Sequence, residues 1–174
     1  MIEHPNRKST RLAGFDYSSA GMYFITLVTH ERRHLFGEII TREMILNDFG
    51  KLAASEWLLS GQIRQEIELD EWCIMPNHFH GIILLKENKQ RGLLSGTCVN
   101  GIDRKPKSLG SLVAGFKSSV THKINERRGT PGIPVWQRNY YDHIIRDEKD
   151  LNRIQEYIIN NPLKWEIDRE YSDR

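Results

Sequence analysis

The apolar residues of the chain form two kinds of pattern. In some stretches they run together or alternate with polar residues, which is typical of strands; in others they recur every three or four residues, which is typical of helices. The first pattern predicts main strands over residues 22–29, 66–74, 78–85 and 135–145, and a small hairpin over 36–40 and 43–46. The second predicts helices from 47 or 48 to 60 or 61, from 109 to 124, and from 147 to 160.

The order of these elements predicts the fold class. With the small hairpin set aside, the chain reads strand, helix, strand, strand, helix, strand, and then one more helix. This order matches an α+β, ferredoxin-like split βαβ sandwich, in which an antiparallel sheet carries its helices on one face and leaves the other face open. We therefore expect one domain over 1–174, with a basic arm over 1–21, a long polar loop over 86–107 and an added C-terminal helix.

Composition narrows the class of protein without identifying it. The 174 residues are 39% hydrophobic and carry a formal net charge of +2, as is common for globular domains. No run of about 18 apolar residues predicts a membrane span. Cys73 and Cys98 alone predict no disulfide framework, which fits a reducing cytoplasm. Arg7, Lys8 and Arg11 are candidate contacts to nucleic-acid phosphates, although such clusters are usually solvated surface.

Two histidines stand one residue apart at the start of the predicted strand 78–85. Because side chains alternate between the faces of a strand, His78 and His80 point to the same side. Two imidazoles on a rigid strand form two-thirds of a metal site, whose third ligand must come from elsewhere in the chain. A histidine on a strand is often just a hydrogen-bonded polar residue, but a pair directly after Met-Pro-Asn favours metal ligation.

The last predicted helix carries residues that would complete such a site. Tyr157 and Asn161 are four residues apart and therefore share a helix face, with Asn160 as the alternative to Asn161. Two histidines and one amide oxygen suit Mg²⁺ or Mn²⁺ better than structural Zn²⁺. A phosphodiester held there would be open to attack by the phenol of Tyr157, with a phosphotyrosine as product. Packing is the alternative role for Tyr157 and the expected one for Tyr140 and Tyr141.

The chain resembles the REP-associated tyrosine transposases, a branch of the single-tyrosine HUH transposases that act on single-stranded DNA. The resemblance extends over about residues 7–165, and only the 86–107 loop is unmatched. Its main motifs are 75–81 (Met-Pro-Asn-His-Phe-His-Gly), which looks like the family's His-hydrophobic-His motif, and 157–162, which looks like its catalytic helix. The other similar stretches are 7–12 with 14–17, 23–26, 35–39, 136–137 and 141–146.

The resemblance implies a function for these residues. It implies that His78, His80 and Asn161 hold Mg²⁺ or Mn²⁺, and that Tyr157 on the C-terminal helix is the catalytic nucleophile. It implies metal-dependent cleavage and strand transfer of hairpin-forming single-stranded DNA through a 5′-phosphotyrosine, as in DNA transposition. It also implies that the protein acts as a monomer or a homodimer.

Several alternatives remain open at this point. His143 is a candidate DNA contact that could instead bond a backbone carbonyl or support the metal site, and Arg146 could contact DNA or stabilise the local fold. Trp165 is a candidate anchor for the polar tail. The rival functions are a non-catalytic nucleic-acid module that binds through its open sheet face, a small metallohydrolase that uses metal-bound water, and a structural protein with a packed histidine pair.

Overall fold

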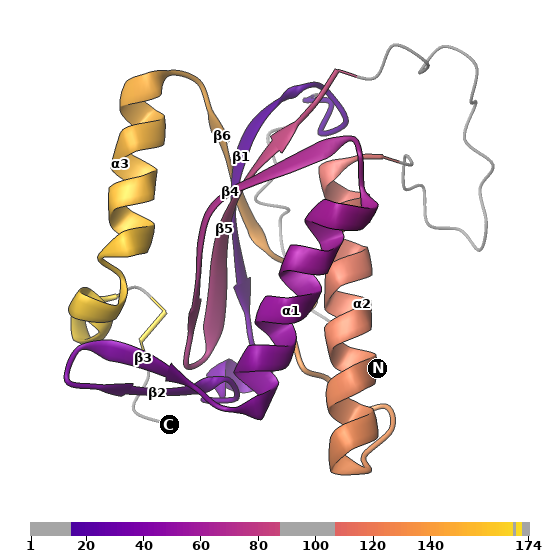
Figure 1. Ribbon diagram of the computed structural model, residues 1–174, viewed down its shortest axis with the longest axis vertical. Coiled ribbons are helices and arrows are strands. Elements are labelled where there is room, and N and C mark those ends of the chain that lie inside the picture. The colour runs from indigo at the N-terminus through magenta and orange to yellow at the C-terminus, as the bar shows by residue number, and fades with distance from the viewer. Residues whose placement is uncertain (1–14, 88–106, 169, 172–174) are drawn as a thin grey trace, which may run out of the picture.

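A four-stranded antiparallel sheet forms the centre of the molecule (Figure 1). The computed structural model describes residues 15–87, 107–168 and 170–171. The strands lie in the order β4-β5-β1-β6. Their bounds are Gly21–Val28 for β1, Ile67–Met75 for β4, His78–Leu85 for β5 and Tyr141–Ile145 for β6. This strand order confirms the predicted ferredoxin-like split βαβ arrangement.

Helices cover both faces of this sheet (Figure 1). Helices α1 (Asp48–Ile63) and α2 (Leu109–Arg128) lie side by side on one face, as the fold class predicts. Helix α3 (Glu148–Ile159) lies on the opposite face, which the fold otherwise leaves open, and a short 3₁₀ helix, η3 (Pro162–Ile167), follows it. The sheet therefore has two apolar interfaces instead of one.

The alternation of side chains along the strands creates these two interfaces. On β1, Tyr23, Ile25 and Leu27 point into the large core under α1 and α2, whereas Phe24 points into a smaller core under α3. The large core is rich in aromatic rings, and Trp57 of α1 packs on Phe79 of β5 with ring centroids 4.6 Å apart. The smaller core consists of buried residues from the sheet and α3, namely Phe24, Ile82, Ile145, Ile154 and Ile158.

A polar side chain caps the N-terminus of each of the three described α-helices. Asn47 accepts hydrogen bonds from the first free amides of α1, Ser108 forms a capping box at α2, and Asp147 accepts one from the amide of Asp150 at α3. The β2–β3 hairpin (Gly37–Ile40 and Glu43–Leu46) confirms the predicted turn, with Thr41 and Arg42 both in the left-handed region.

Two predicted segments differ in the structure. The last strand was expected from residue 135 but begins at Tyr141, because Trp136 forms only an isolated bridge with Thr29 and Lys117 donates to the carbonyl of Gln137. The tail, expected to be polar with Trp165 as a candidate anchor, also forms η3 and buries Trp165, which confirms that residue as an anchor.

Part of the predicted organisation lies beyond the described residues. This holds for most of the arm over 1–21 and of the loop over 86–107, and for Arg7, Lys8, Arg11 and Cys98. Within the described part of the chain, no helix combines the length and apolar character needed to cross a membrane.

Candidate metal and nucleophile site

Strand β5 places both histidines under α3. His78 and His80 point to the α3 face, while Phe79 between them points into the large core. The two histidine rings lie with centroids 4.4 Å apart, and both residues are at most 2% exposed. The sequence prediction that the two imidazoles share one face is therefore confirmed.

Buried polar neighbours orient the two rings. Asn77 donates through Nδ2 to the carbonyl of Glu170, so its Oδ1 is free to accept from Nδ1 of His78 at 2.8 Å. This bond leaves the lone pair of His78 on Nε2, which has no hydrogen-bond partner among the described residues. Nδ1 of His80 lies 2.9 Å from the hydroxyl of Thr26, which can accept or donate and so suits either tautomer.

The end of α3 brings two further predicted residues to this point. The hydroxyl of Tyr157 lies 3.2 Å from Nε2 of His80, and Asn161 is buried just beyond the helix, before Pro162. Oδ1 of Asn161 has no hydrogen-bond partner in the described part of the chain. Asn160 instead bonds back to the carbonyl of Glu156 on its own helix. Of the two asparagines, the fold therefore brings Asn161 to the histidines.

Asp168 also reaches the site, and the sequence interpretation missed it. Its Oδ2 accepts from the Tyr157 hydroxyl at 2.7 Å and from Nδ2 of Asn161 at 2.8 Å. Its Oδ1 lies 3.9 Å from Nε2 of His78. Asp168 follows the apolar anchor Trp165 by three residues, but no periodicity continues to it, so the tail carried no signal that would have identified it.

The surroundings favour the neutral forms of the two histidines and of Tyr157. Burial lowers the pKa of His78 to about 4, although the nearby Asp168 charge and Asn161 partly oppose this. Burial, and then the proximity of His78, lower the pKa of His80. Burial raises the pKa of Tyr157, and its hydrogen bond to Asp168 raises it further. Both imidazoles are therefore neutral near pH 7, which is the form that binds metal ions.

The donor set fits a divalent cation. Ligand atoms of His78, His80 and Asp168 lie within 4.8 Å of one another. The unpaired Nε2 of His78 and Oδ1 of Asn161 are buried polar atoms of the kind that a bound ion would satisfy. Two nitrogens with amide or carboxylate oxygens form a mixed set suited to Mg²⁺ or Mn²⁺.

Several proteins are similar in sequence to this chain. No protein-family model matches it. An uncharacterised protein of Haemophilus influenzae is 41% identical over 177 residues, which cover 97% of this chain and 94% of that protein. A second H. influenzae protein, named as a candidate REP-associated tyrosine transposase, is 24% identical over 157 residues (86% of this chain, 74% of that protein). The REP-associated tyrosine transposase of Escherichia coli K12 is 21% identical over 157 residues (90% and 75%).

The chain is therefore similar in sequence to REP-associated tyrosine transposases. A solved structure of such a transposase bound to a REP hairpin covers 88% of this chain and 73% of its own, with 23% identity and a TM-score of 0.58. That structure shares the fold of this chain.

Of the other predicted DNA contacts, the structure describes His143 and Arg146. Nε2 of His143 lies 2.7 Å from Asp150, which also accepts from Arg153, so His143 is engaged in a local hydrogen bond. Arg146 is exposed directly after β6. Tyr141 is exposed on β6 with its ring edge-on to Phe24, whereas the hydroxyl of Tyr157 is the one that contacts His80.

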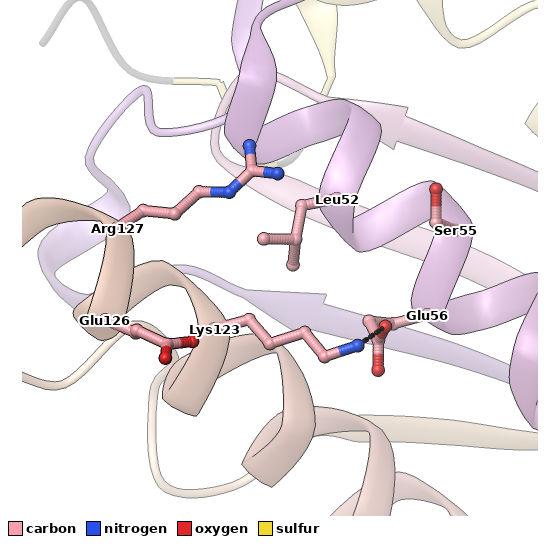
Figure 2. Close-up of a pocket in the computed structure, with 6 residues that line it drawn as sticks. All are labelled: Leu52, Ser55, Glu56, Lys123, Glu126 and Arg127. Atoms are coloured by element: carbon pink, nitrogen blue, oxygen red, sulfur yellow. Dashed lines mark hydrogen bonds and ion pairs between the residues drawn. The ribbon is translucent and has the colours of Figure 1, made fainter.

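A hollow lies between α1 and α2, on the face of the sheet opposite α3 (Figure 2). Lys123 of α2 reaches across to the carboxylate of Glu56 on α1, and Ser119 donates to the same carboxylate. Glu126 and Arg127 line the rim with opposite charges. Because its central charges are paired with each other, this hollow is a helix–helix contact and not a second site for chemistry.

Proposed function

We propose that this chain is a transposase that cleaves and rejoins single-stranded DNA in a metal-dependent reaction with Tyr157 as nucleophile. The observation that carries the proposal is the contact between the Tyr157 hydroxyl and His80, beside His78 and Asn161. A phenol, two neutral imidazoles and an amide oxygen meet in one buried corner of the sheet. This grouping is what phosphoryl transfer to a tyrosine requires.

In this proposal the chain's own residues prepare the attack. Nε2 of His78, Nε2 of His80 and Oδ1 of Asn161 would hold Mg²⁺ or Mn²⁺, with Oδ1 of Asp168 as the other available oxygen. When bound, a divalent ion would polarise the scissile phosphate and stabilise its developing negative charge. Asn77 and Thr26 keep the imidazoles oriented. Helix α3 holds the phenol oxygen at the edge of the site, open to solvent on one side, since Tyr157 is 37% exposed.

The bond changes of the proposed reaction balance without an energy source. The phenol oxygen of Tyr157 forms a bond to phosphorus, and the bond from phosphorus to the 3′-oxygen breaks. The 5′-phosphotyrosine stores the energy of the original phosphodiester. A 3′-hydroxyl of a second strand can then displace the tyrosine and restore a phosphodiester, which is the strand-transfer step.

We propose hairpin-forming single-stranded DNA as the substrate. The support is the similarity to REP-associated tyrosine transposases, one of which has been solved bound to a REP hairpin. Basic side chains would bind the DNA backbone electrostatically, and in this proposal they include Arg7, Lys8, Arg11 and Arg146, with His143 as a further candidate. Whether the protein acts as a monomer or a homodimer would be read from its mass in solution with and without the hairpin.

A covalent-adduct assay tests the proposal. The protein is mixed with end-labelled hairpin DNA and Mn²⁺ or Mg²⁺ and run on a denaturing gel. We expect a protein–DNA band that disappears in EDTA and with Tyr157→Phe, but persists with the matched control Tyr141→Phe. His80→Ala should lose the band yet keep DNA binding.

Other outcomes would favour the rival functions. Cleavage without an adduct, insensitive to Tyr157→Phe, would replace the tyrosine mechanism with a metallohydrolase. Tight binding across a library of hairpins without any cleavage would leave a non-catalytic nucleic-acid module. A structural role for the histidine pair would be favoured if Mn²⁺ caused no shift in the melting temperature of the wild-type protein.

A further inference from the structure

The carboxylate of Asp168 meets the proposed nucleophile directly. Oδ2 of Asp168 lies 2.7 Å from the hydroxyl oxygen of Tyr157. A carboxylate can only accept a hydrogen bond, so the phenol proton points at Asp168. The other neighbour of that hydroxyl is Nε2 of His80, at 3.2 Å.

Several contacts hold Asp168 in this position. Its side chain is 1% exposed. Its Oδ1 accepts from the amide of Glu170 at 2.7 Å. Glu170 is held in turn by Asn77, which donates to its carbonyl, and by Arg32, whose guanidinium lies 2.5 Å from its carboxylate. Trp165, buried earlier in the same segment, packs near the ring of His78 with centroids 5.8 Å apart. These contacts fix the position of the Asp168 carboxylate beside Tyr157.

The phenol needs such a proton acceptor. A tyrosine hydroxyl is almost fully protonated near pH 7, because its reference pKa is about 10. When the oxygen bonds to phosphorus, its proton must therefore leave. Nε2 of His80 is not free to take it if that nitrogen holds the metal ion. Among the described residues, the other acceptor at hydrogen-bond distance is Oδ2 of Asp168.

We propose that Asp168 is a further catalytic residue, the general base that takes the Tyr157 proton during attack on the DNA. This inference rests on the proposed function. The Oη–H bond breaks as the Oη–P bond forms, the proton moves to Oδ2 of Asp168, and the departing 3′-oxygen takes a proton from water. In the strand-transfer step the protonated Asp168 returns its proton to the leaving phenol oxygen. Asn161, which donates to the same Oδ2, keeps that oxygen directed at the hydroxyl.

The first test compares wild type with Asp168→Asn, which keeps the size and one oxygen acceptor but removes the basic carboxylate. Single-turnover adduct formation is measured at saturating hairpin DNA and saturating Mn²⁺. General-base catalysis is typically worth about 10²–10⁴-fold, so a loss of that size is expected. Because Asp168 also accepts from the proposed ligand Asn161, Mn²⁺ affinity should fall by up to about 10–100-fold, and the saturating Mn²⁺ removes this effect from the measured rate. An unchanged rate would overturn the inference, and so would a rate restored by raising Mn²⁺, because Asp168 would then be a metal ligand.

The second test separates proton transfer from positioning. Replacing Tyr157 by 3,5-difluorotyrosine lowers the pKa of the phenol, so that a base is needed less. The loss caused by Asp168→Asn should then shrink to less than about tenfold, whereas a residue that only positions the ring would cause the same loss in both backgrounds. That equal loss would overturn the inference. Asp168→Ser is the second variant if Asp168→Asn melts below the assay temperature.

The two levels of proposal fail in different ways. If wild type forms no adduct, or if the adduct survives Tyr157→Phe, the proposed function itself is wrong. If wild type forms the tyrosine adduct and Asp168→Asn forms it equally fast, only the role of Asp168 is wrong.

Discussion

Replacing Thr26 by valine would leave Nδ1 of His80 without its partner. Thr26 is 5% exposed and His80 is 2% exposed, and their bond measures 2.9 Å. Valine has nearly the same shape, so the change removes a hydroxyl without opening a cavity. A buried polar atom that loses its partner costs about 1–3 kcal/mol, so we expect about 2 kcal/mol of lost stability. For a chain of this length, that is a fall of about 4–8 °C in melting temperature.

The same substitution should weaken metal binding. Loss of the neighbour that orients a ligating histidine typically lowers metal affinity about 10–100-fold. Calorimetry with Mn²⁺ would measure this directly, alongside melting curves with and without the ion. Thr26→Ser is the matched control, because it keeps the hydroxyl and should keep affinity within about threefold. If Thr26→Val bound Mn²⁺ as tightly as wild type, the idea that Thr26 orients His80 as a ligand would be refuted. If Thr26→Ser lost as much as Thr26→Val, the methyl group and not the hydroxyl would be responsible.

The remaining predictions concern stability in the large core and between the helices. Burial alone would raise the pKa of Glu56, but hydrogen bonds from Lys123 and Ser119 lower it below its ordinary value. Wild type should therefore exceed Glu56→Gln in denaturant-measured stability above about pH 5, and the difference should vanish as the pH falls below about 4; a pH-independent difference would contradict this. Gly50→Ala should destabilise by about 1–3 kcal/mol although alanine favours helices, because its Cβ would lie 2.2 Å from the carbonyl oxygen of Phe36. Gly115→Ala is the matched helix control: its Cβ would meet only a flexible arginine nitrogen at 3.4 Å, so it should stabilise by about 0.5–1 kcal/mol, and equal effects at both glycines would refute the argument. Trp57→Ala should cost about 3–5 kcal/mol, measured in the same denaturant assay, because the ring is 0% exposed; a cost below about 1 kcal/mol would contradict its place in the core.

Local sequence patterns were enough to predict the fold and half of the site. Strand β5 was predicted with its observed bounds, because a β-branched apolar run follows directly on the histidine pair. Alternation along that strand then placed His78 and His80 on one face. The cap at Asp147 and the apolar spacing from Leu151 likewise predicted α3. These are short-range signals, and each depends on only a few neighbouring residues.

The long-range contacts of the site could not be predicted in the same way. Spacing allowed both Asn160 and Asn161 to be ligands, and the choice depends on how Pro162 redirects the chain after α3. Asp168 reaches Tyr157 only because η3 turns the tail back and Trp165 buries it. His143 contacts Asp150 because the chain turns sharply between β6 and α3. The spacing of apolar residues gives no information about such a turn.

The small core under α3 has a consequence for how the molecule opens. Helix α3 rests on the sheet through a few apolar side chains, chiefly Ile154 and Ile158, whereas α1 and α2 share the much larger aromatic core. The free energy needed to open an element locally rises with the amount of apolar surface that the element buries. Helix α3 is therefore the cooperative unit that costs least to detach, and its departure would leave the sheet with α1 and α2 intact. The proposed nucleophile, Tyr157, thus lies on the helix best able to move, which in the proposed reaction would carry a covalently attached strand away from the strand end it has left.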